Sequence, residues 1–474
     1  MQEKQIDKLR HTGLFALFLV FAISSLSAAA LPALRVSDNG RFLVTEEGKP
    51  FFWLGDTAWS LFEKLNREDA ERYLTDRASK GFTVIQSVLI FEGGIKPNAY
   101  GHPQFLRKKD GSLDASRLNE KYAEHVDYIV NKAESMGLYI GVIPVWATNI
   151  RRDRGLFHAS NTDEAHRYGR FLGRRYRDKP IIWVLGGDYH PEGADEVWRE
   201  LAKGLAKGDG DRHVVTYHPP GGQQSSTWFH NEKWLDFNMI QSGHSRHNRN
   251  YEMIAKDYGL KPVKPVVDGE PGYENITEGL KAAGPGVPRL TAADVRRFAY
   301  CGVFAGAAGH TYGCNEIYQF WVKGTKPHAR WGATVPWKQA LDLRGAGQMQ
   351  HLRNLIESRP MLIRIPDQSL LASDAGWTQS RVQAARGSDG SYAFVYIASG
   401  KPVTIRTDRL SGGTIKAYWF DPRQGTSRMI ETFARAKTRR FTPPSSGKDN
   451  DWVLVMEDAA KGFVLPGTHA IHEK

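Results

Sequence analysis

Two carboxylic acids, Asp188 and Glu270, stand where short apolar segments run into glycine turns. Asp188 ends the segment "IIWVLGGD", and Glu270 lies in "VVDGEP". Glycosidic-bond cleavage requires one carboxylic acid that protonates the leaving oxygen and a second carboxylate that attacks the anomeric carbon or activates water. We expect Gly186 and Gly187 to let the backbone approach a ligand closely, with no packing requirement of their own. The pair therefore predicts a glycoside hydrolase.

The expected reaction is retaining, with Glu270 as the nucleophile and Asp188 as the general acid and base. That mechanism predicts carboxyl groups about 5–5.5 Å apart, whereas a gap of ~6.5–9.5 Å indicates inversion. Loss of either group is expected to lower the rate by roughly 10²- to 10⁴-fold. Glu274 is the alternative nucleophile. Asp268 alternates with Glu270 along the segment, and we expect it to be structural.

Polar and aromatic residues gather at the ends of the other apolar segments. Sugars have apolar C–H faces that pack on aromatic rings, and the chain contains 13 tryptophans. A helix cap is the alternative role for Asp56, and a structural role at the barrel top is the alternative for His244 and His310. The residues expected to bind substrate are Asp56, Trp59, Gln86, Trp146, His190, Tyr217, His218, Gln241, His244, His310 and Tyr312.

Short apolar segments alternate with helical ones over residues 52–360, which is typical of β/α units around a parallel sheet. Near-continuous apolar strands indicate burial on both faces. Eight such strands close a barrel whose active site lies at their C-terminal ends. No G-x-G-x-x-G follows an early strand, which disfavours an open doubly wound sheet. The eight predicted strands are "FFWLG", "FTVIQSVLI", "LYIGVIPVW", "IIWVLGGD", "HVVTYHP", "FNMIQSGHS", "PVVDGEP" and "AGHTYG".

The predicted fold is α/β, a (β/α)8 TIM barrel followed by a small all-β sandwich domain. The barrel takes residues 31–360 and begins with a β hairpin over residues 34–51, which we expect to plug its bottom. Residues 361–474 form the C-terminal domain and tail. The segments "SYAFVYIAS", "VTIRT", "TIKAYWFDP" and "DWVLVMED" are predicted strands of that domain.

Residues 1–30 are typical of a signal peptide. Lys4, Lys8 and Arg10 form a positive start, residues 14–23 are an unbroken apolar run, and residues 24–30 are mostly small. The run is short for a bilayer span. We expect cleavage near Ala30, export to the periplasm or out of the cell, and no stable membrane insertion afterwards. An uncleaved N-terminal anchor is the alternative.

The formal net charge is +12, and residues 1–30 carry three positive and two negative charges, so +11 remains without them. The basic residues are dispersed, so we expect no nucleic-acid partner; an acidic polysaccharide is the more specific option. Cys301 and Cys314 do not make a disulfide framework, and we expect both to be free and buried. No metal-binding spacing occurs, so no metal or cofactor is expected.

Several separated motifs carry a family resemblance over roughly residues 34–360. They are "FFWLGDTAWSLFEKLNREDAERYL", "RRYRDKPIIWVLGGD", "TYHPPGG", "LDFNMIQSGH" and "KPVVDGEPGYE", and together they resemble the apiosidase-like glycoside hydrolases. The resemblance implies an Asp acid/base at Asp188 and a Glu nucleophile at Glu270. It also implies a substrate such as the apiose-containing side chains of rhamnogalacturonan II, a pectin. The tail resembles that family's C-terminal module, named for collagen binding; a β-sandwich alone does not imply a ligand.

Two other functions remain open from the sequence. A non-catalytic carbohydrate-binding or adhesion protein on a barrel would keep an aromatic cleft without two opposed carboxylates. The second alternative is another exported barrel hydrolase or a polysaccharide lyase. A lyase would leave an unsaturated sugar and would not need a nucleophilic Glu.

Overall fold

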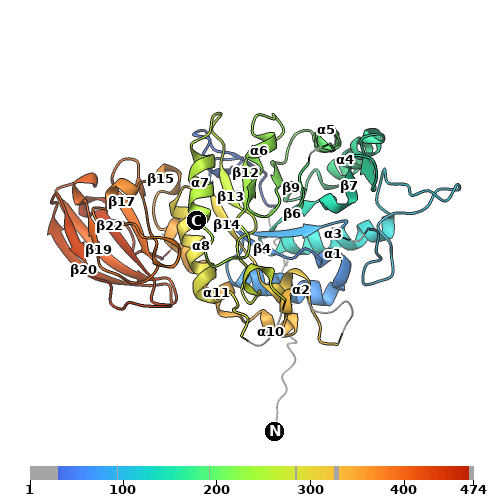
Figure 1. The fold of residues 1–474 in the computed structure, drawn as a ribbon. Helices are drawn as coiled ribbons and strands as arrows, with labels where there is room; N and C mark the ends of the chain where they lie inside the picture. The colour runs from blue at the N-terminus through green and yellow to red at the C-terminus, as the bar shows by residue number, and fades with distance from the viewer. Residues whose placement is uncertain (1–29, 93, 192, 283–285, 325–329, 469–474) are drawn as a thin grey trace, which may run out of the picture.

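The computed structural model describes residues 30–92, 94–191, 193–282, 286–324 and 330–468. Within them the chain forms an α/β barrel and, on the left of Figure 1, an all-β domain coloured orange to red. The predicted signal peptide lies outside the described residues, apart from Ala30 at its end. Among the described residues, no helix has the length and apolar character needed to cross a membrane.

Eight parallel strands form the barrel wall, in the order and at the places that the sequence predicted. The ends of the sheet, β10 and β12, lie side by side, since the Asp236 N–H donates to Val215 O at 2.9 Å and Thr216 Oγ1 donates to Phe237 O at 2.7 Å. A short antiparallel strand, β11 (Gln223–Gln224), is added to β12. The wall strands are β4 (Trp53–Thr57), β5 (Val84–Val88), β6 (Tyr139–Ile143), β9 (Ile181–Gly186), β10 (Val215–His218), β12 (Asn238–Gln241), β13 (Val266–Asp268) and β14 (Gly309–Tyr312).

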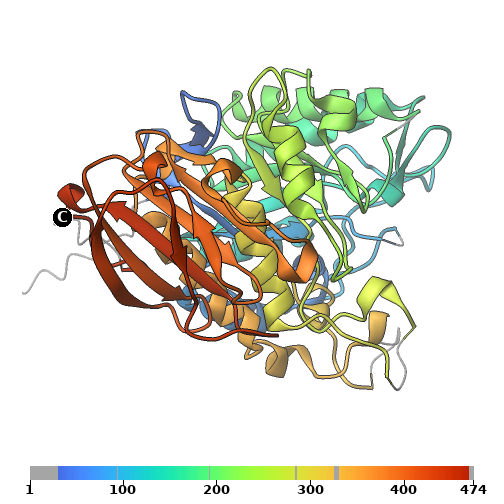
Figure 2. The ribbon, with the colours of Figure 1, turned by 60° about the vertical axis from the view of Figure 1, so that its left-hand side comes forward.

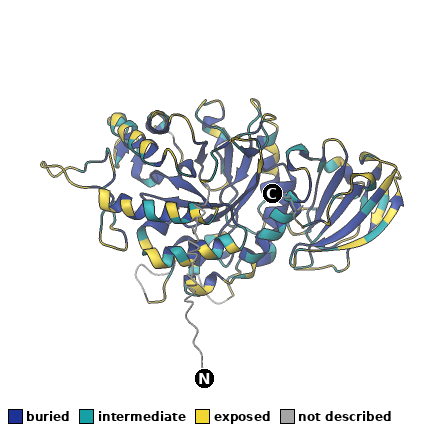
Figure 3. Cartoon of the chain, turned by 180° about the vertical axis from the view of Figure 1, so that it is seen from behind, coloured by how far each residue is buried: buried dark blue, intermediate teal, exposed yellow. Residues whose placement is uncertain are grey.

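Helices cover the outside of the barrel, with their exposed faces turned to solvent in Figure 3. The first long helix begins after Asn66, whose side chain accepts a hydrogen bond from Asp69 N at 2.9 Å and so caps it. The helices are α1 (Leu61–Lys64), α2 (Arg67–Ser79), α3 (Glu120–Ser135), α4 (Thr162–Tyr176), α5 (Asp195–Asp209), α6 (Ser226–Phe229), α7 (Asn250–Tyr258), α8 (Ala292–Phe304), α9 (Asn315–Tyr318), α10 (Trp337–Ala340) and α11 (Arg344–Glu357).

A small sheet precedes the barrel and lies at its N-terminal end. The predicted hairpin is a three-stranded antiparallel sheet of β1 (Leu34–Val36), β2 (Leu43–Thr45) and β3 (Pro50–Phe51). The ring of Phe51 lies 5.1 Å from that of Tyr139, whose hydroxyl donates to Pro32 O at 2.6 Å. Tyr139 is the first residue of β6, so these contacts lie at the bottom of the barrel, opposite the catalytic end.

The C-terminal domain is a six-stranded antiparallel sheet that packs against a two-stranded one. Residues of both sheets, such as Val395, Ile405 and Phe441, share one apolar cluster. Four of these strands, β17, β18, β19 and β22, lie where the sequence predicted strands. The strands are β15 (Arg364–Pro366), β16 (Val382–Gly387), β17 (Tyr392–Ile397), β18 (Val403–Ile405), β19 (Thr414–Asp421), β20 (Thr426–Ala434), β21 (Arg439–Phe441) and β22 (Trp452–Asp458).

The all-β domain packs on α8 of the barrel, as Figure 2 shows from the side of that domain. Tyr300 stacks on Tyr396 with ring centroids 5.0 Å apart, and Phe304 stacks on Phe394 at 5.5 Å. These β17 side chains belong to the same apolar core as the barrel. Cys301 also lies in α8, and it is buried and free, as is Cys314. The large apolar interface joins the two domains firmly.

Glycines let α4 and α5 approach one another backbone to backbone. A Cβ atom at Gly204 would lie 2.2 Å from His166 O, and one at Gly173 would lie 2.3 Å from Leu205 O. Glycine in a helix is normally less stable than alanine by roughly 0.5–1 kcal/mol. Here the close contact reverses that preference, because an added methyl group has no space.

We expect Gly204→Ala to destabilise the protein by about 1–3 kcal/mol, the usual cost of overpacking a tight contact. The matched control is Gly347→Ala in α11, where a new Cβ meets nothing within 4 Å. That change should be neutral or stabilise by up to ~1 kcal/mol. Urea unfolding of both variants measures the difference. Equal stability of the two variants would contradict the close approach of α4 and α5.

Candidate active site

The structure brings Asp188 and Glu270 together at the C-terminal end of the barrel. Asp188 lies two residues beyond β9, and Glu270 lies two residues beyond β13. A carboxylate oxygen of Asp188 and a carboxylate oxygen of Glu270 lie within 4.8 Å of each other, and a ring nitrogen of His218 lies within 4.8 Å of both oxygens. The two carboxyl groups therefore share one small space.

Three successive residues before and at this site have left-handed backbone angles. The φ values are 90° at Gly186, 121° at Gly187 and 57° at Asp188. A Cβ at Gly186 would lie 2.3 Å from His218 O, and one at Gly187 would lie 2.4 Å from the ring of Trp146. The expectation that these glycines have no packing role was therefore wrong. They pack against the neighbouring strands, and the turn they make aims Asp188 at Glu270.

Two histidines hold the carboxylate of Glu270. His218 Nε2 lies 3.0 Å from Oε2, and His244 Nε2 lies 3.2 Å from Oε1. Burial alone would raise the pKa of Glu270, but the contacts with His218 and His244 outweigh burial and lower the pKa to about 2. Glu270 is therefore an anion over the whole physiological range of pH.

The pKa of Asp188 moves in the opposite direction. Burial raises it to about 7, and the negative charge of Glu270 adds to that rise. Gln241 and His218 oppose the rise only in part. Near neutral pH a large share of Asp188 carries a proton beside an ionised Glu270. Two carboxyl groups whose environments push their pKa values apart can divide the roles of acid and nucleophile.

A cavity of about 610 Å³ opens over the two carboxylates, a size typical of small-ligand sites. An aromatic wall flanks it, because the ring of Trp146 lies 5.3 Å from Trp59 and 5.2 Å from Phe91. Of the residues expected to bind substrate, Trp59, Trp146, Gln241 and His244 line this cavity. The cavity therefore offers both flat apolar surfaces and hydrogen-bonding groups to a sugar.

Other predicted residues lie behind the cavity and support it. His218 is fully buried and contacts Glu270. Gln86 Nε2 donates to Gly269 O at 2.9 Å and so holds the turn before Glu270. Tyr217 is buried, and its hydroxyl donates to Tyr189 O at 3.1 Å. Because these side chains do not line the cavity, we correct their expected role from substrate contact to support.

His190 also lies outside the cavity lining, at the surface. It is exposed, and its ring lies 5.3 Å from that of Trp228. The cavity lining therefore gives no support to the expected substrate contact of His190.

Three predicted residues face the helix layer, and for them the expected substrate contact was wrong. Asp56 Oδ2 accepts hydrogen bonds from Tyr73 at 2.5 Å and from Arg77 at 2.6 Å, both on α2. His310 is fully buried, which lowers its pKa to about 3 and keeps it neutral. Tyr312 donates to Glu274. Trp53 Nε1 donates to Thr311 Oγ1, and both side chains point into the barrel. Successive strand residues point to opposite faces, so His310 and Tyr312 point outward.

The alternative nucleophile, Glu274, lies away from the cavity. Its carboxylate accepts hydrogen bonds from Tyr312 at 2.6 Å and from Gly345 N at 3.0 Å, at the start of α11. Asp268 is structural, as expected, since it accepts hydrogen bonds from Ser242 at 2.9 Å and Asn250 at 3.1 Å. These bonds hold the loop that carries His244.

Several residues of the cavity wall were not predicted from the sequence. Tyr273 lies with its ring 4.5 Å from that of His244, and its position three residues after Glu270 was the one available signal. Tyr318 and Trp331 come from the segment after β14, far from any predicted strand end. An ion pair between Arg330 and Glu92 joins two loops at the rim.

Asp188, His218 and Glu270 also have the residue types and the closeness that could hold a metal ion. We expect the reaction to need no metal, because His218 Nε2 already lies 3.0 Å from Glu270 Oε2, in the space that an ion bound by both would occupy. Dialysis against EDTA should leave hydrolysis unchanged. Loss of activity that zinc restores would contradict this expectation and would reassign the three residues as ligands.

Comparisons with known proteins agree with this geometry. A barrel with two opposed carboxylates in an aromatic cavity defines the class of glycoside hydrolases. The family model "Apiosidase-like, catalytic domain" matches residues 37–363, so the chain belongs to the apiosidase-like family. The model "Putative collagen-binding domain of a collagenase" matches residues 365–457. No curated protein matches the chain.

Two solved structures are similar over almost the whole chain. One, described as a glycoside hydrolase, is 37% identical, with a TM-score of 0.84 over 91% of this chain and 98% of its own. The other, a glycoside hydrolase family 5 protein from Bacteroides vulgatus, is 36% identical, with a TM-score of 0.84 over 92% and 96%. The chain is therefore a glycoside hydrolase with a C-terminal all-β domain.

Proposed function

We propose that this chain cleaves a glycosidic bond with retention of anomeric configuration, with Glu270 as nucleophile and Asp188 as acid and base. The observation that carries the proposal is the pair of carboxylate oxygens within 4.8 Å of each other, with pKa values displaced in opposite directions. Retaining enzymes place the two groups about 5–5.5 Å apart, and inverting enzymes leave room for a water molecule between them.

The reaction runs in two steps. A carboxylate oxygen of Glu270 attacks the anomeric carbon as the bond to the leaving oxygen breaks, and Asp188 gives its proton to that oxygen. Asp188, now ionised, takes a proton from a water molecule as the oxygen of that water attacks the anomeric carbon and the bond from that carbon to Glu270 breaks. Asp188 is then protonated and Glu270 ionised again, as at the start.

The proposed substrate is a plant or microbial polysaccharide. Apiose-containing side chains of pectin, as in rhamnogalacturonan II, are the first candidates, on the strength of the family. The proposed site of action is outside the cytoplasm, in the periplasm or the medium. The support for export is the basic start and apolar run within residues 1–30.

Purified protein offered a panel of plant and bacterial glycans tests the proposal. Products are detected by mass spectrometry, and for each substrate that is cut, proton NMR follows the anomer formed first. The expected result is release of a reducing sugar with the configuration of the bond that was cut. An initial product of inverted configuration would refute the retaining mechanism, and an unsaturated product would indicate a lyase.

A further inference from the structure

A second cavity lies between the barrel and the C-terminal domain. Its volume is about 670 Å³, and it is open to solvent. The start of α8 and Arg246 line it from the barrel, and the segments around Trp377, Lys401 and Lys448 line it from the all-β domain. We call this cavity the interdomain cleft. Because α8 precedes β14 in the chain, its N-terminal end lies on the catalytic face of the barrel.

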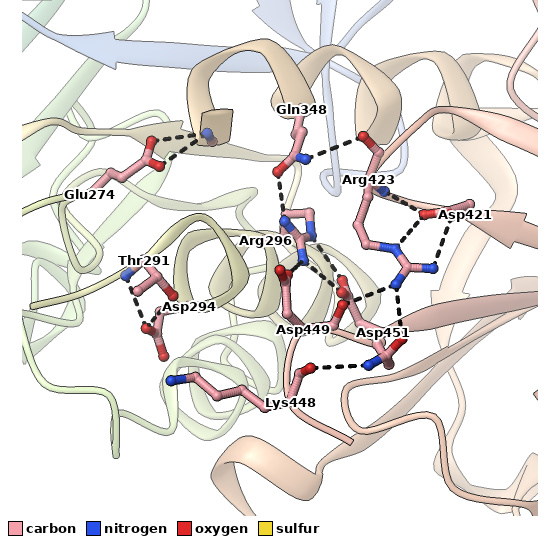
Figure 4. Close-up of polar contacts among 12 residues, drawn as sticks. Glu274, Thr291, Asp294, Arg296, Gln348, Asp421, Arg423, Lys448, Asp449 and Asp451 are labelled. Atoms are coloured by element: carbon pink, nitrogen blue, oxygen red, sulfur yellow. Dashed lines mark hydrogen bonds and ion pairs between the residues drawn. The ribbon is translucent and has the colours of Figure 1, made fainter. Parts of the chain in front are cut away.

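The floor of the interdomain cleft is fixed by a buried charge network, shown in Figure 4. The Arg296 side chain on α8 donates to both carboxylate oxygens of Asp451, at 3.0 and 2.7 Å, and to Asp449 at 2.5 Å. Arg296 also donates to Gln348 of α11 at 2.6 Å. A bidentate arginine–carboxylate pair has a defined geometry. The cleft therefore has a rigid floor that is built from both domains.

Trp377 forms one wall of the cleft and is unusually exposed. Its exposed fraction is 59%, the highest among the large apolar side chains that the structure describes as exposed. A tight turn presents it, with φ angles of 60° at Gly376 and 42° at Thr378. Left-handed angles are unfavourable for a β-branched residue, and such strain gathers at functional sites. The guanidinium of Arg249 lies 4.6 Å from the ring centroid and steadies it.

The charge left over at the rim of the cleft is positive. Arg296 is a single cation between two carboxylates, Asp449 and Asp451, so one negative charge remains there, and Asp294 pairs with Arg297 at 3.6 Å. Two exposed lysines, Lys401 and Lys448, make no ion pair within the described residues. The two lysines of the rim outweigh that one remaining negative charge. In Figure 4 the Lys448 side chain points away from the Arg296 network. An exposed aromatic ring beside unpaired cations matches a sugar that carries a carboxylate.

One loop joins this cleft to the catalytic cavity. This loop is residues 242–249, directly after β12. The catalytic cavity is lined by Gly243, His244 and Ser245, and the interdomain cleft is lined by Arg246. His244 contacts Glu270 and accepts a hydrogen bond at its carbonyl from Gly279 N at 2.8 Å. The two cavities are thus separated by the thickness of one loop that is held in place.

We infer that the interdomain cleft binds a distal, uronate-bearing stretch of the same polysaccharide that is cut over Asp188 and Glu270. Trp377 stacks on a sugar face, and Lys401 and Lys448 pair with the carboxylates. The C-terminal domain thereby adds binding energy remote from the scissile bond. This inference rests on the proposed function for its substrate, and its binding test does not require turnover.

The test uses full-length protein with Glu270→Gln, so that bound polymer stays intact, and polygalacturonate as the probe. Titration calorimetry should show binding that weakens as salt rises. Trp377→Ala, and separately Lys401→Ala with Lys448→Ala, should each weaken it by about tenfold, the scale of a single important contact. Fully methyl-esterified polygalacturonate, which has the same backbone without charge, should bind more weakly. Lys437→Ala, an exposed lysine elsewhere on the domain, is the control.

Three results would overturn the inference: no binding of polygalacturonate, binding that neither variant weakens, or binding of collagen that these variants abolish. If the protein hydrolyses a glycan but binds no polygalacturonate, the proposed binding role of the interdomain cleft is refuted and the catalytic proposal stands. If the wild-type protein binds the polymer but hydrolyses no glycan, the catalytic proposal is refuted and binding at the cleft stands. In the active enzyme, Trp377→Ala should lower kcat/KM on the polymer more than on a short substrate.

Discussion

Glu270→Gln should lower kcat by on the order of 10⁴-fold on any substrate that the wild-type protein cuts. The amide is nearly the same size, but it has no negative charge and cannot form the bond to the anomeric carbon. It also changes the contacts that the carboxylate oxygens make with His218 at 3.0 Å and His244 at 3.2 Å. The measurement is single-turnover hydrolysis at saturating substrate, with circular dichroism to show that the fold persists.

The matched control for this prediction is Glu274→Gln, four residues away and equally buried. Glu274 serves Tyr312 and the start of α11, so its amide should lower the melting temperature while turnover stays within a few-fold. Chemical rescue sharpens the assignment. With Glu270→Ala, azide can enter the vacated space and should yield a glycosyl azide of inverted configuration. If azide instead rescues a Glu274→Ala protein, Glu274 and not Glu270 is the nucleophile.

Asp188→Asn should lower kcat by roughly 10²- to 10⁴-fold on substrates with poor leaving groups. A substrate whose leaving group is a dinitrophenol needs no proton, so its cleavage step should lose much less. Asp163→Asn is the control, because Asp163 is an exposed residue in the first turn of α4. Equal losses on both substrate types would argue against Asp188 as the acid.

Asp188 also determines how kcat/KM changes at alkaline pH. Asp188 must carry its proton, and its pKa is raised to about 7, so kcat/KM should fall as pH rises through about 7. Glu270 must be ionised, and its pKa is lowered to about 2, so the acid limb should begin only near pH 2. The two groups interact, so the two limbs report the pair. In Asp188→Asn the alkaline limb should disappear; its persistence there would assign it to another group.

The two carboxylates could be found from the sequence because both follow a strand through a glycine turn. In a barrel the strand ends converge, so a reactive side chain at each end is placed by topology alone. Asp188 and Glu270 needed nothing more. The contacts of Gly186 and Gly187 could not be foreseen, because the residues they meet come from elsewhere in the chain: His218 from β10 and Trp146 from the loop after β6.

Most wrong predictions of substrate-binding residues came from not knowing whether a strand side chain points into the barrel or toward the helices. Barrel strands are buried on both faces, so the hydrophobic pattern does not reveal which residues point inward. Asp56, His310 and Tyr312 were assigned to the site because they are polar and near strand ends. Asp56 and Tyr312 instead join Arg77 and Glu274 in the helix layer. Loop residues such as Trp331 depend on long connections that no local pattern predicts.

The most direct test of the catalytic pair is trapping of the covalent intermediate. A 2-deoxy-2-fluoro derivative of the sugar that the glycan panel identifies, with a good leaving group, should inactivate the enzyme and label one peptide. Fragmentation of that peptide, which contains both Glu270 and Glu274, should place the glycosyl group on Glu270. A label on Glu274, or no label with an inverted hydrolysis product, would contradict the account.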